Sequence, residues 1–153
     1  MVKRIVGFFF LLLSVCLAVA AHAQSKSNED VIKAFLTSQE THEPGMEEAA
    51  QSMGNAIADL DGDGKDEIIL VWTTLGPTYW RNTLTVFSID GEKEYKPASS
   101  FALEGAAENP SVKNGVILVE QVLYAKTDPI CCPTIKKQMK YRWDKKGITI
   151  IDQ

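Results

Sequence analysis

The sequence is poor in the side chains that enzymes most often use as nucleophiles, general bases and metal ligands. It has two histidines and three cysteines, and His42 is the one histidine outside the first 23 residues. No Ser-His-Asp pattern, glycine-rich phosphate loop or histidine-based metal motif is present. A catalytic pair of His42 with Cys131 or Cys132 is disfavoured, because adjacent cysteines in an oxidising compartment are poor nucleophiles. We therefore expect that the protein is not an enzyme.

Positive charge is also scarce. The chain has 16 Lys and Arg residues against 20 Asp and Glu residues, a formal net charge of −4 at pH 7. Loss of Lys3 and Arg4 with a leader peptide would make the remaining chain more acidic. An acidic surface is a poor match for a phosphate backbone or an anionic membrane, so we expect no nucleic-acid partner.

The one long hydrophobic run lies near the N-terminus, over residues 5–21. It follows a short basic start and precedes Ala21-His22-Ala23, a pattern typical of signal-peptide cleavage before Gln24. We predict a signal peptide over residues 1–23, a periplasmic or secreted protein, and no transmembrane segment after cleavage. A retained membrane anchor is the alternative, although the run is shorter than the ~20 residues that cross a bilayer. Lipidation of Cys16 also stays open, although a bulky valine precedes it.

Residues 24–153 have the length of a single domain with one hydrophobic core. Apolar side chains repeat at i, i+4 over residues 28–41, which predicts an amphipathic helix. A weaker helical pattern covers residues 46–53, where Gly54 is placed to end a second short helix.

The chain after this region has the pattern of strands and turns. We predict strands over residues 67–74, 83–89, 116–124, 135–143 and 148–151. The strand over 135–143 alternates a mostly apolar side with a polar and basic side, as in a sheet with one face in water. The predicted fold class is α+β, a mainly antiparallel twisted β-sheet of about six or seven strands with one or two N-terminal helices.

An acidic loop is the most informative local pattern. Asp59, Asp61 and Asp63 stand at loop positions 1, 3 and 5, and a glycine at position 6 permits a sharp turn. Lys65 at position 7 would supply its carbonyl oxygen, and Glu67 at position 9 a further oxygen. A flexible set of oxygen ligands favours Ca²⁺ over Mg²⁺. The alternative is an ordinary Asp/Gly turn that holds no metal.

The stretch from Ala58 to Leu70 closely resembles the calcium loop of FG-GAP/VCBS repeats. The resemblance implies calcium ligands at the five positions named above, with Glu67 where that family usually has Asp. It differs from an EF-hand, which needs Glu at position 12, where Leu70 stands. FG-GAP repeats build propellers from several blades, whereas this chain has one such loop, so the resemblance extends to the ion site alone.

Cys131 and Cys132 are the only cysteines after residue 23. Adjacent Cα atoms lie ~3.8 Å apart, closer than in most disulfides, but an oxidising compartment favours a bridge between them. Two free thiols, an intermolecular disulfide, a soft-metal site and a redox-sensing role are the alternatives. The segment 128–134 resembles the Asp-Pro-x-Cys-Cys-Pro-Ser/Thr segment of small secreted bacterial proteins and lipoproteins, including LppP/LprE-type envelope proteins, and the similarity extends over roughly residues 55–145. That resemblance implies no biochemical activity for this chain.

Two functions follow from these features. The first is an exported calcium-binding envelope module with a structural role or a binding role toward an envelope polymer or protein. Tyr79 and Trp80 are the candidate ligand-binding residues, unless they pack in the core. The alternative is a periplasmic inhibitor or immunity-type protein that acts on an envelope enzyme through the 125–134 loop, which two prolines and the cysteine pair stiffen.

Overall fold

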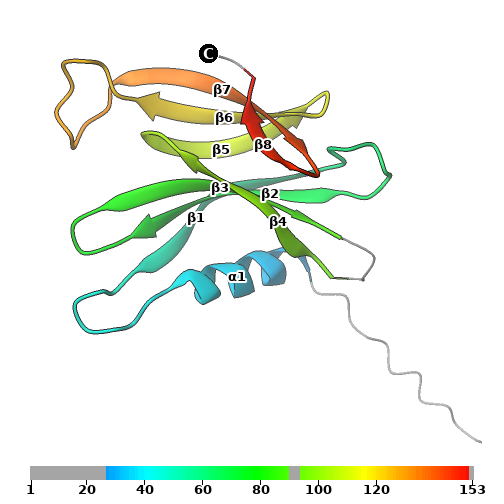
Figure 1. The fold of residues 1–153 in the computed structure, drawn as a ribbon, viewed down its shortest axis with the longest axis horizontal. Coiled ribbons are helices and arrows are strands. Elements are labelled where there is room, and N and C mark those ends of the chain that lie inside the picture. The colour runs from blue at the N-terminus through cyan, green and yellow to red at the C-terminus, as the bar shows by residue number, and fades with distance from the viewer. Residues whose placement is uncertain (1–26, 90–93, 152–153) are drawn as a thin grey trace, which may run out of the picture.

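The structure, a computed structural model, describes residues 27–89 and 94–151 (Figure 1). The predicted signal peptide and Cys16 lie outside the described residues. The described chain forms one helix, α1 (Asn28–Gln39), and eight strands. The strands are β1 (Ala49–Ala58), β2 (Glu67–Leu75), β3 (Trp80–Ser88), β4 (Lys96–Leu103), β5 (Ala106–Lys113), β6 (Val116–Leu123), β7 (Ile135–Asp144) and β8 (Gly147–Ile150).

Two antiparallel sheets, each a meander of consecutive strands, pack on one another. The first has the order β1-β2-β3-β4 and the second β5-β6-β7-β8. Helix α1 covers the face of the first sheet that points away from the second sheet (Figure 1). The predicted α+β, mainly antiparallel fold is confirmed, with eight strands in place of six or seven. Among the described residues, no helix is both long and apolar enough to cross a membrane.

Strand β2 is buried on both faces and contributes to two hydrophobic clusters. Its odd-numbered side chains, such as Val71, pack between the two sheets, while its even-numbered ones face α1. On the helix side, the Phe35 ring meets the rings of Trp72 and Phe87 edge-on, with centroids 5.4 and 5.0 Å apart. Full burial of such a side chain stabilises the fold by roughly 1.5–3 kcal/mol relative to exposure. This double burial explains the unbroken apolar run that predicted the strand.

Helix α1 forms where the i, i+4 pattern predicts it. Ser27 caps the first turn, because its Oγ accepts a hydrogen bond from the Asp30 backbone N–H at 3.2 Å and the Asp30 carboxylate accepts one from the Ser27 N–H. The helix ends at Gln39, two residues before the predicted end.

The predicted second helix over residues 46–53 is wrong, because residues 49–58 form strand β1. Strand β1 pairs with β2 along its whole length, and the backbone hydrogen bonds of that ladder outweigh a short helical spacing of Ala and Met. Gly54 ends no helix. It lies at a register shift in the middle of β1, with φ of +126°.

Strands β4 and β5 were not predicted, since neither has the usual strand composition. Strand β4 contains one large apolar ring, Phe101, among small and polar residues. Strand β5 contains Asn109 at φ +51° and Pro110, where the pairing with β6 shifts register. Both strands form because the neighbouring strands β3 and β6 offer them backbone pairing on either side of a register shift.

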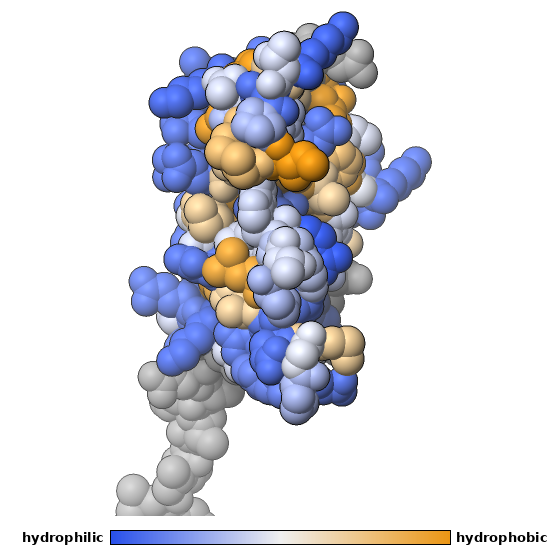
Figure 2. Space-filling view, turned by 90° about the vertical axis from the view of Figure 1, so that its left-hand side faces the viewer, coloured by the Kyte–Doolittle hydropathy of each residue, from blue (hydrophilic) through white to orange (hydrophobic). Residues whose placement is uncertain are grey.

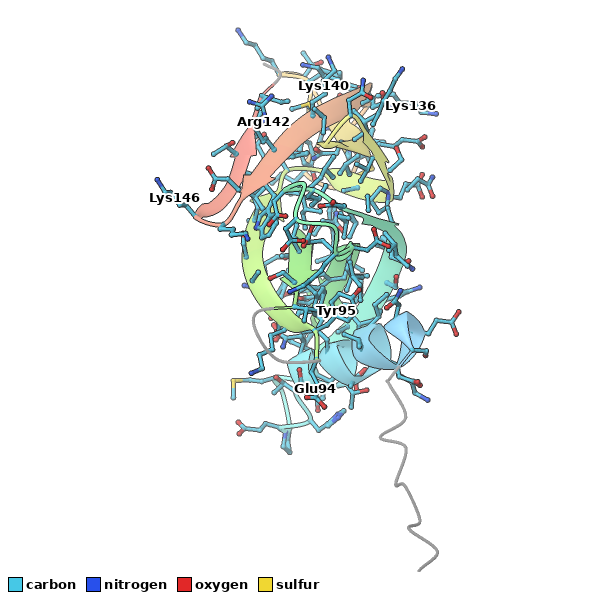
Figure 3. All side chains as sticks on the ribbon, turned by 90° about the vertical axis from the view of Figure 1, so that its right-hand side faces the viewer. Glu94, Tyr95, Lys136, Lys140, Arg142 and Lys146 are labelled. Carbon is cyan, nitrogen blue, oxygen red and sulfur yellow. A yellow bond between two sulfur atoms is a disulfide. The ribbon has the colours of Figure 1, made fainter. Side chains whose placement is uncertain are left out.

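Strand β7 confirms the predicted alternation. Met139, Tyr141 and Trp143 are buried against the first sheet. The opposite side presents Lys136, Lys140 and Arg142, which stand out along the top of the molecule (Figure 3).

Candidate functional site

The acidic loop connects β1 to β2, and the hairpin positions both of its ends. Ala58 pairs with Glu67 at the end of the ladder, so Asp59 leaves β1 beside the first residue of β2. Asp59, Asp61 and Glu67 each place a carboxylate oxygen within 4.8 Å of the others. This group of three can hold a metal ion. Three of the five predicted ligand residues therefore lie close together, because the hairpin and its loop place them within nine consecutive positions.

Backbone amides fold the loop around the aspartates. The two carboxylate oxygens of Asp59 accept hydrogen bonds from the N–H groups of Gly62 at 2.7 Å and Gly64 at 2.9 Å. Both glycines have positive φ, +78° and +83°, which side chains with a Cβ rarely adopt. Asp61 accepts from the Asp63 N–H at 3.0 Å in the same way. Hydrogen bonds within the loop therefore stabilise its conformation and hold the carboxylates in position.

Glu67 is the buried member of the group, with 2% of its surface exposed. Its Oε2 accepts a hydrogen bond from the Leu60 N–H at 2.8 Å. Burial raises the pKa of this carboxyl above its ordinary value, and the nearby Asp59 and Asp61 charges raise it further, against the effect of the Leu60 hydrogen bond. A buried carboxylate among other carboxylates is stabilised by a cation placed between them.

Asp63 and Lys65, the other two residues of the predicted ligand set, lie outside the group of three. The Asp63 Oδ1 accepts a hydrogen bond from the Lys65 N–H at 2.9 Å. The participation of the Lys65 carbonyl remains a prediction.

Lys145, which the sequence reasoning missed, approaches the loop from the turn between β7 and β8. Its Nζ lies 3.1 Å from Asp61 Oδ2 and 3.9 Å from Asp63 Oδ2. The hydrogen bond with this ammonium is the main cause that lowers the pKa of Asp61, and it raises the pKa of Lys145 in turn. No local signal could have found Lys145, because only the packing of the two sheets brings it to the loop.

A hollow of about 400 Å³ lies beside the loop and is lined by Asp61, Glu67, Trp143 and Lys145, among others. Among the described residues, the indole Nε1 of Trp143 is the one fully buried side-chain nitrogen or oxygen that has no hydrogen-bond partner. The hollow therefore combines carboxylate acceptors with an ammonium donor, and it has a buried indole in its wall.

The predicted cysteine bridge has the proximity that it needs. Cys131 and Cys132 lie at disulfide-bonding distance from each other. The surrounding loop is held by Asp128, whose carboxylate accepts hydrogen bonds from the N–H groups of Ala125 at 2.7 Å and Thr134 at 2.9 Å. These bonds, chiefly the one from Ala125, lower the pKa of Asp128. Ile130 at the tip of this loop is 93% exposed.

Tyr79 and Trp80 are not buried in the core, and the two side chains have different surroundings. They are 42% and 39% exposed. The Tyr79 hydroxyl donates a hydrogen bond to Glu48, and the Arg81 guanidinium lies 5.0 Å from the centre of the Tyr79 ring and also donates to Glu48, at 3.1 Å. Trp80 starts β3 opposite Leu75 and lines a cleft between the sheets. Of the two, only Trp80 faces that cleft.

Comparison with known proteins found no family model, no curated protein and no solved structure that matches this chain.

Proposed function

We propose that the protein is an exported envelope module that binds Ca²⁺ at the acidic loop and has a structural or binding role rather than a catalytic one. The observation that carries the proposal is the convergence of Asp59, Asp61 and the buried Glu67 on one point. Its donor set is made of oxygen atoms alone, which suits Ca²⁺, and the loop is more flexible than the strict octahedral site that Mg²⁺ prefers. The signal peptide predicted over residues 1–23 supports export.

The ion would act on stability through the β1–β2 hairpin. Strand β2 contributes to both hydrophobic clusters, and the loop at its start carries several negative charges. Without a cation, these charges repel one another and oppose closure of the loop. A bound cation removes this repulsion in the native state alone, so it favours folding.

The test is thermal unfolding of the mature protein in calcium, in magnesium and in chelator. Calcium modules outside the cell commonly have Kd of ~10⁻⁴–10⁻³ M, so millimolar calcium should raise the melting temperature. A hundredfold excess over Kd stabilises by roughly 2.7 kcal/mol. Magnesium should have a much smaller effect, and chelator should lower the melting temperature.

Two matched variants locate the response. Asp61→Asn should abolish the effect of calcium, because Asp61 belongs to the group of three. Asp66→Asn, in the same loop but outside that group, should retain the effect. A melting curve that is the same in calcium and in chelator for the unmodified protein would overturn the proposal.

An inhibitor or immunity-type role is the second candidate, and the exposed tip of the 125–134 loop favours it. Ile130 is 93% exposed on a loop that the Asp128 hydrogen bonds hold rigid, as expected of a segment that inserts into a partner. A pull-down from periplasmic extract, with Ile130→Asp as the comparison, tests this role. One stoichiometric enzyme partner that the variant loses supports it, and equal capture by both proteins contradicts it.

A further inference from the structure

The two sheets leave a cleft between them at the end of the molecule away from the acidic loop. Strand β2 is nine residues long, so at ~3.3 Å per residue its first residue in the acidic loop and its last residue in the cleft lie roughly 26 Å apart. The cleft has a volume of about 660 Å³ and is lined by strands of both sheets. This volume lies in the range of sites for small organic ligands, ~300–1,000 Å³.

One wall of the cleft is apolar and includes an aromatic ring. Trp80 and Leu75 face each other in the β2–β3 register and are 39% and 41% exposed, and Met53 of β1 lies in the same wall. The surface of this end of the molecule shows hydrophobic patches set among hydrophilic residues (Figure 2). A half-exposed indole in a concave wall is suited to stacking against a flat ligand.

Buried polar groups with unused hydrogen-bonding capacity lie in the same cleft. Asn82 is 5% exposed, and its amide nitrogen donates to the Gly105 carbonyl at 2.7 Å, while its Oδ1 accepts no hydrogen bond in the described part of the chain. Thr73 is 6% exposed, and its hydroxyl has no partner among the described residues. Gln121, by contrast, uses both ends of its amide, with the Glu104 carbonyl and the Tyr141 hydroxyl. An acceptor at Asn82 and a donor and acceptor at Thr73 are thus left for a ligand.

One charged side chain of the second sheet points toward the cleft. Lys137 lies on the core-facing side of β7, half-buried, and has no ion pair with any described residue. Its neighbour Lys136 is exposed on the opposite side of that strand, and Glu108 and Glu120 are exposed on the sides of β5 and β6 that alternate with the buried residues. The cleft therefore adds one ammonium donor to its polar groups.

We propose that this cleft binds a saccharide, such as a short segment of an envelope glycan. A sugar ring has an apolar C–H face that can stack on Trp80. It also carries hydroxyl groups, each both donor and acceptor, which match the mixture at Asn82, Thr73 and Lys137. An acyl chain would leave those polar groups unpaired. The inference rests on the binding role proposed above and names its ligand class.

The test titrates the mature protein with neutral trisaccharides, namely cellotriose, maltotriose and the trimer of N-acetylglucosamine. Calorimetry measures affinity, and tryptophan emission reports the site because Trp72 and Trp143 are buried while Trp80 lines the cleft. We expect saturable binding of at least one neutral trisaccharide. Trp80→Ala should weaken it about tenfold or more, and Trp80→Phe should restore part of the affinity.

Further variants and probes distinguish specific binding in the cleft from nonspecific binding to an apolar surface. Thr73→Val removes a hydroxyl at nearly constant volume and should weaken binding several-fold, whereas Ile150→Ala, at an exposed apolar residue outside the cleft, should leave it unchanged. A hydroxyl-free amphiphile, decanoate, should bind more weakly than the trisaccharide.

The proposal is overturned by absence of saturable binding up to about 10 mM trisaccharide, a weaker affinity than ligand sites of this kind normally have. Unchanged binding in Trp80→Ala, or tighter binding of decanoate, overturns it as well. The titrations are run in calcium and in chelator. Saccharide binding without a calcium response contradicts the calcium site alone, and a calcium response without saccharide binding contradicts the cleft alone.

Discussion

At the scale of single residues, the position of Lys145 decides the electrostatics of the acidic loop. Its ammonium lies 3.1 Å from an oxygen of Asp61, one of the three carboxylates that can hold a metal ion. A calcium ion and this ammonium compete for the same negative charge. The side chain of Lys145 is 69% exposed and belongs to a turn, so it can move aside when a cation binds.

We predict that Lys145→Gln increases the affinity for calcium about two- to fivefold, the effect of one exposed charge interaction. The reason is that the variant removes both the competitor and its repulsion of the incoming ion. Calorimetric titration with calcium measures the change. Lys146→Gln alters the next residue, which has no ion pair with a described residue, and serves as the control. Equal or weaker calcium binding in Lys145→Gln would contradict the competition.

At the scale of elements, strand β1 depends on one glycine. Gly54 has φ +126° at the register shift of β1, and a Cβ added there would lie 2.9 Å from Cδ of Pro110 in β5. The first sheet can thus approach the second closely at this point, because the position has no side chain. The same approach brings β1 and β5 to the walls of the cleft.

Gly54→Ala should lower the free energy of unfolding by about 1–3 kcal/mol, because it combines an unfavourable φ with a clash against β5. Urea unfolding followed by tryptophan emission measures this loss. Gly45→Ala is the matched comparison, since Gly45 has φ +82° with no atom within 4 Å of the added Cβ. Gly45→Ala should lower the free energy of unfolding only through the unfavourable φ. An equal loss in both variants would therefore show that contact with Pro110 is unimportant.

At the scale of the whole molecule, the two candidate sites lie at opposite ends of a two-layer β structure. Strand β2 connects them, starting at Glu67 in the acidic loop and ending at Leu75 in the cleft. The loop of residues 125–134 and the β2–β3 turn lie at the cleft end of the molecule (Figure 1), where Tyr79, Trp80 and Tyr124 are exposed. This separation would allow a bound ion to act on stability while the proposed ligand site remained accessible.

Mass spectrometry of the exported protein should show a chain that starts at Gln24 and has no alkylated cysteine before reduction. After reduction, Cys131 and Cys132 should both take the alkylating reagent, because the two residues lie at disulfide-bonding distance and an oxidising compartment favours a bridge between them. A mass that keeps residues 1–23, or a lipid on Cys16, would contradict the predicted processing. Two alkylated cysteines before reduction would contradict the bridge, and a dimer mass would indicate an intermolecular one.

Much of the fold could be predicted where neighbouring residues determine the structure. The Val31–Phe35 spacing predicted α1, the apolar run after Glu67 predicted β2, and the alternation up to Trp143 predicted β7. The prediction of secondary structure failed where pairing with another strand determines the conformation. Residues 46–53 have a helical spacing, yet most of them belong to β1, because β2 offers them a ladder.

The same division holds for the sites. The sequence by itself determined the acidic loop, since three aspartates, two glycines and Glu67 act within one hairpin and need only short-range hydrogen bonds. A charged Lys137 on the apolar side of β7 was a visible signal of the cleft. Only the tertiary structure brought Lys145 to Asp61 and placed Lys137 of β7 and Trp80 of β3 in the lining of one hollow between two sheets. These contacts join residues from separate strands and turns, and their positions depend on how the sheets twist and pack.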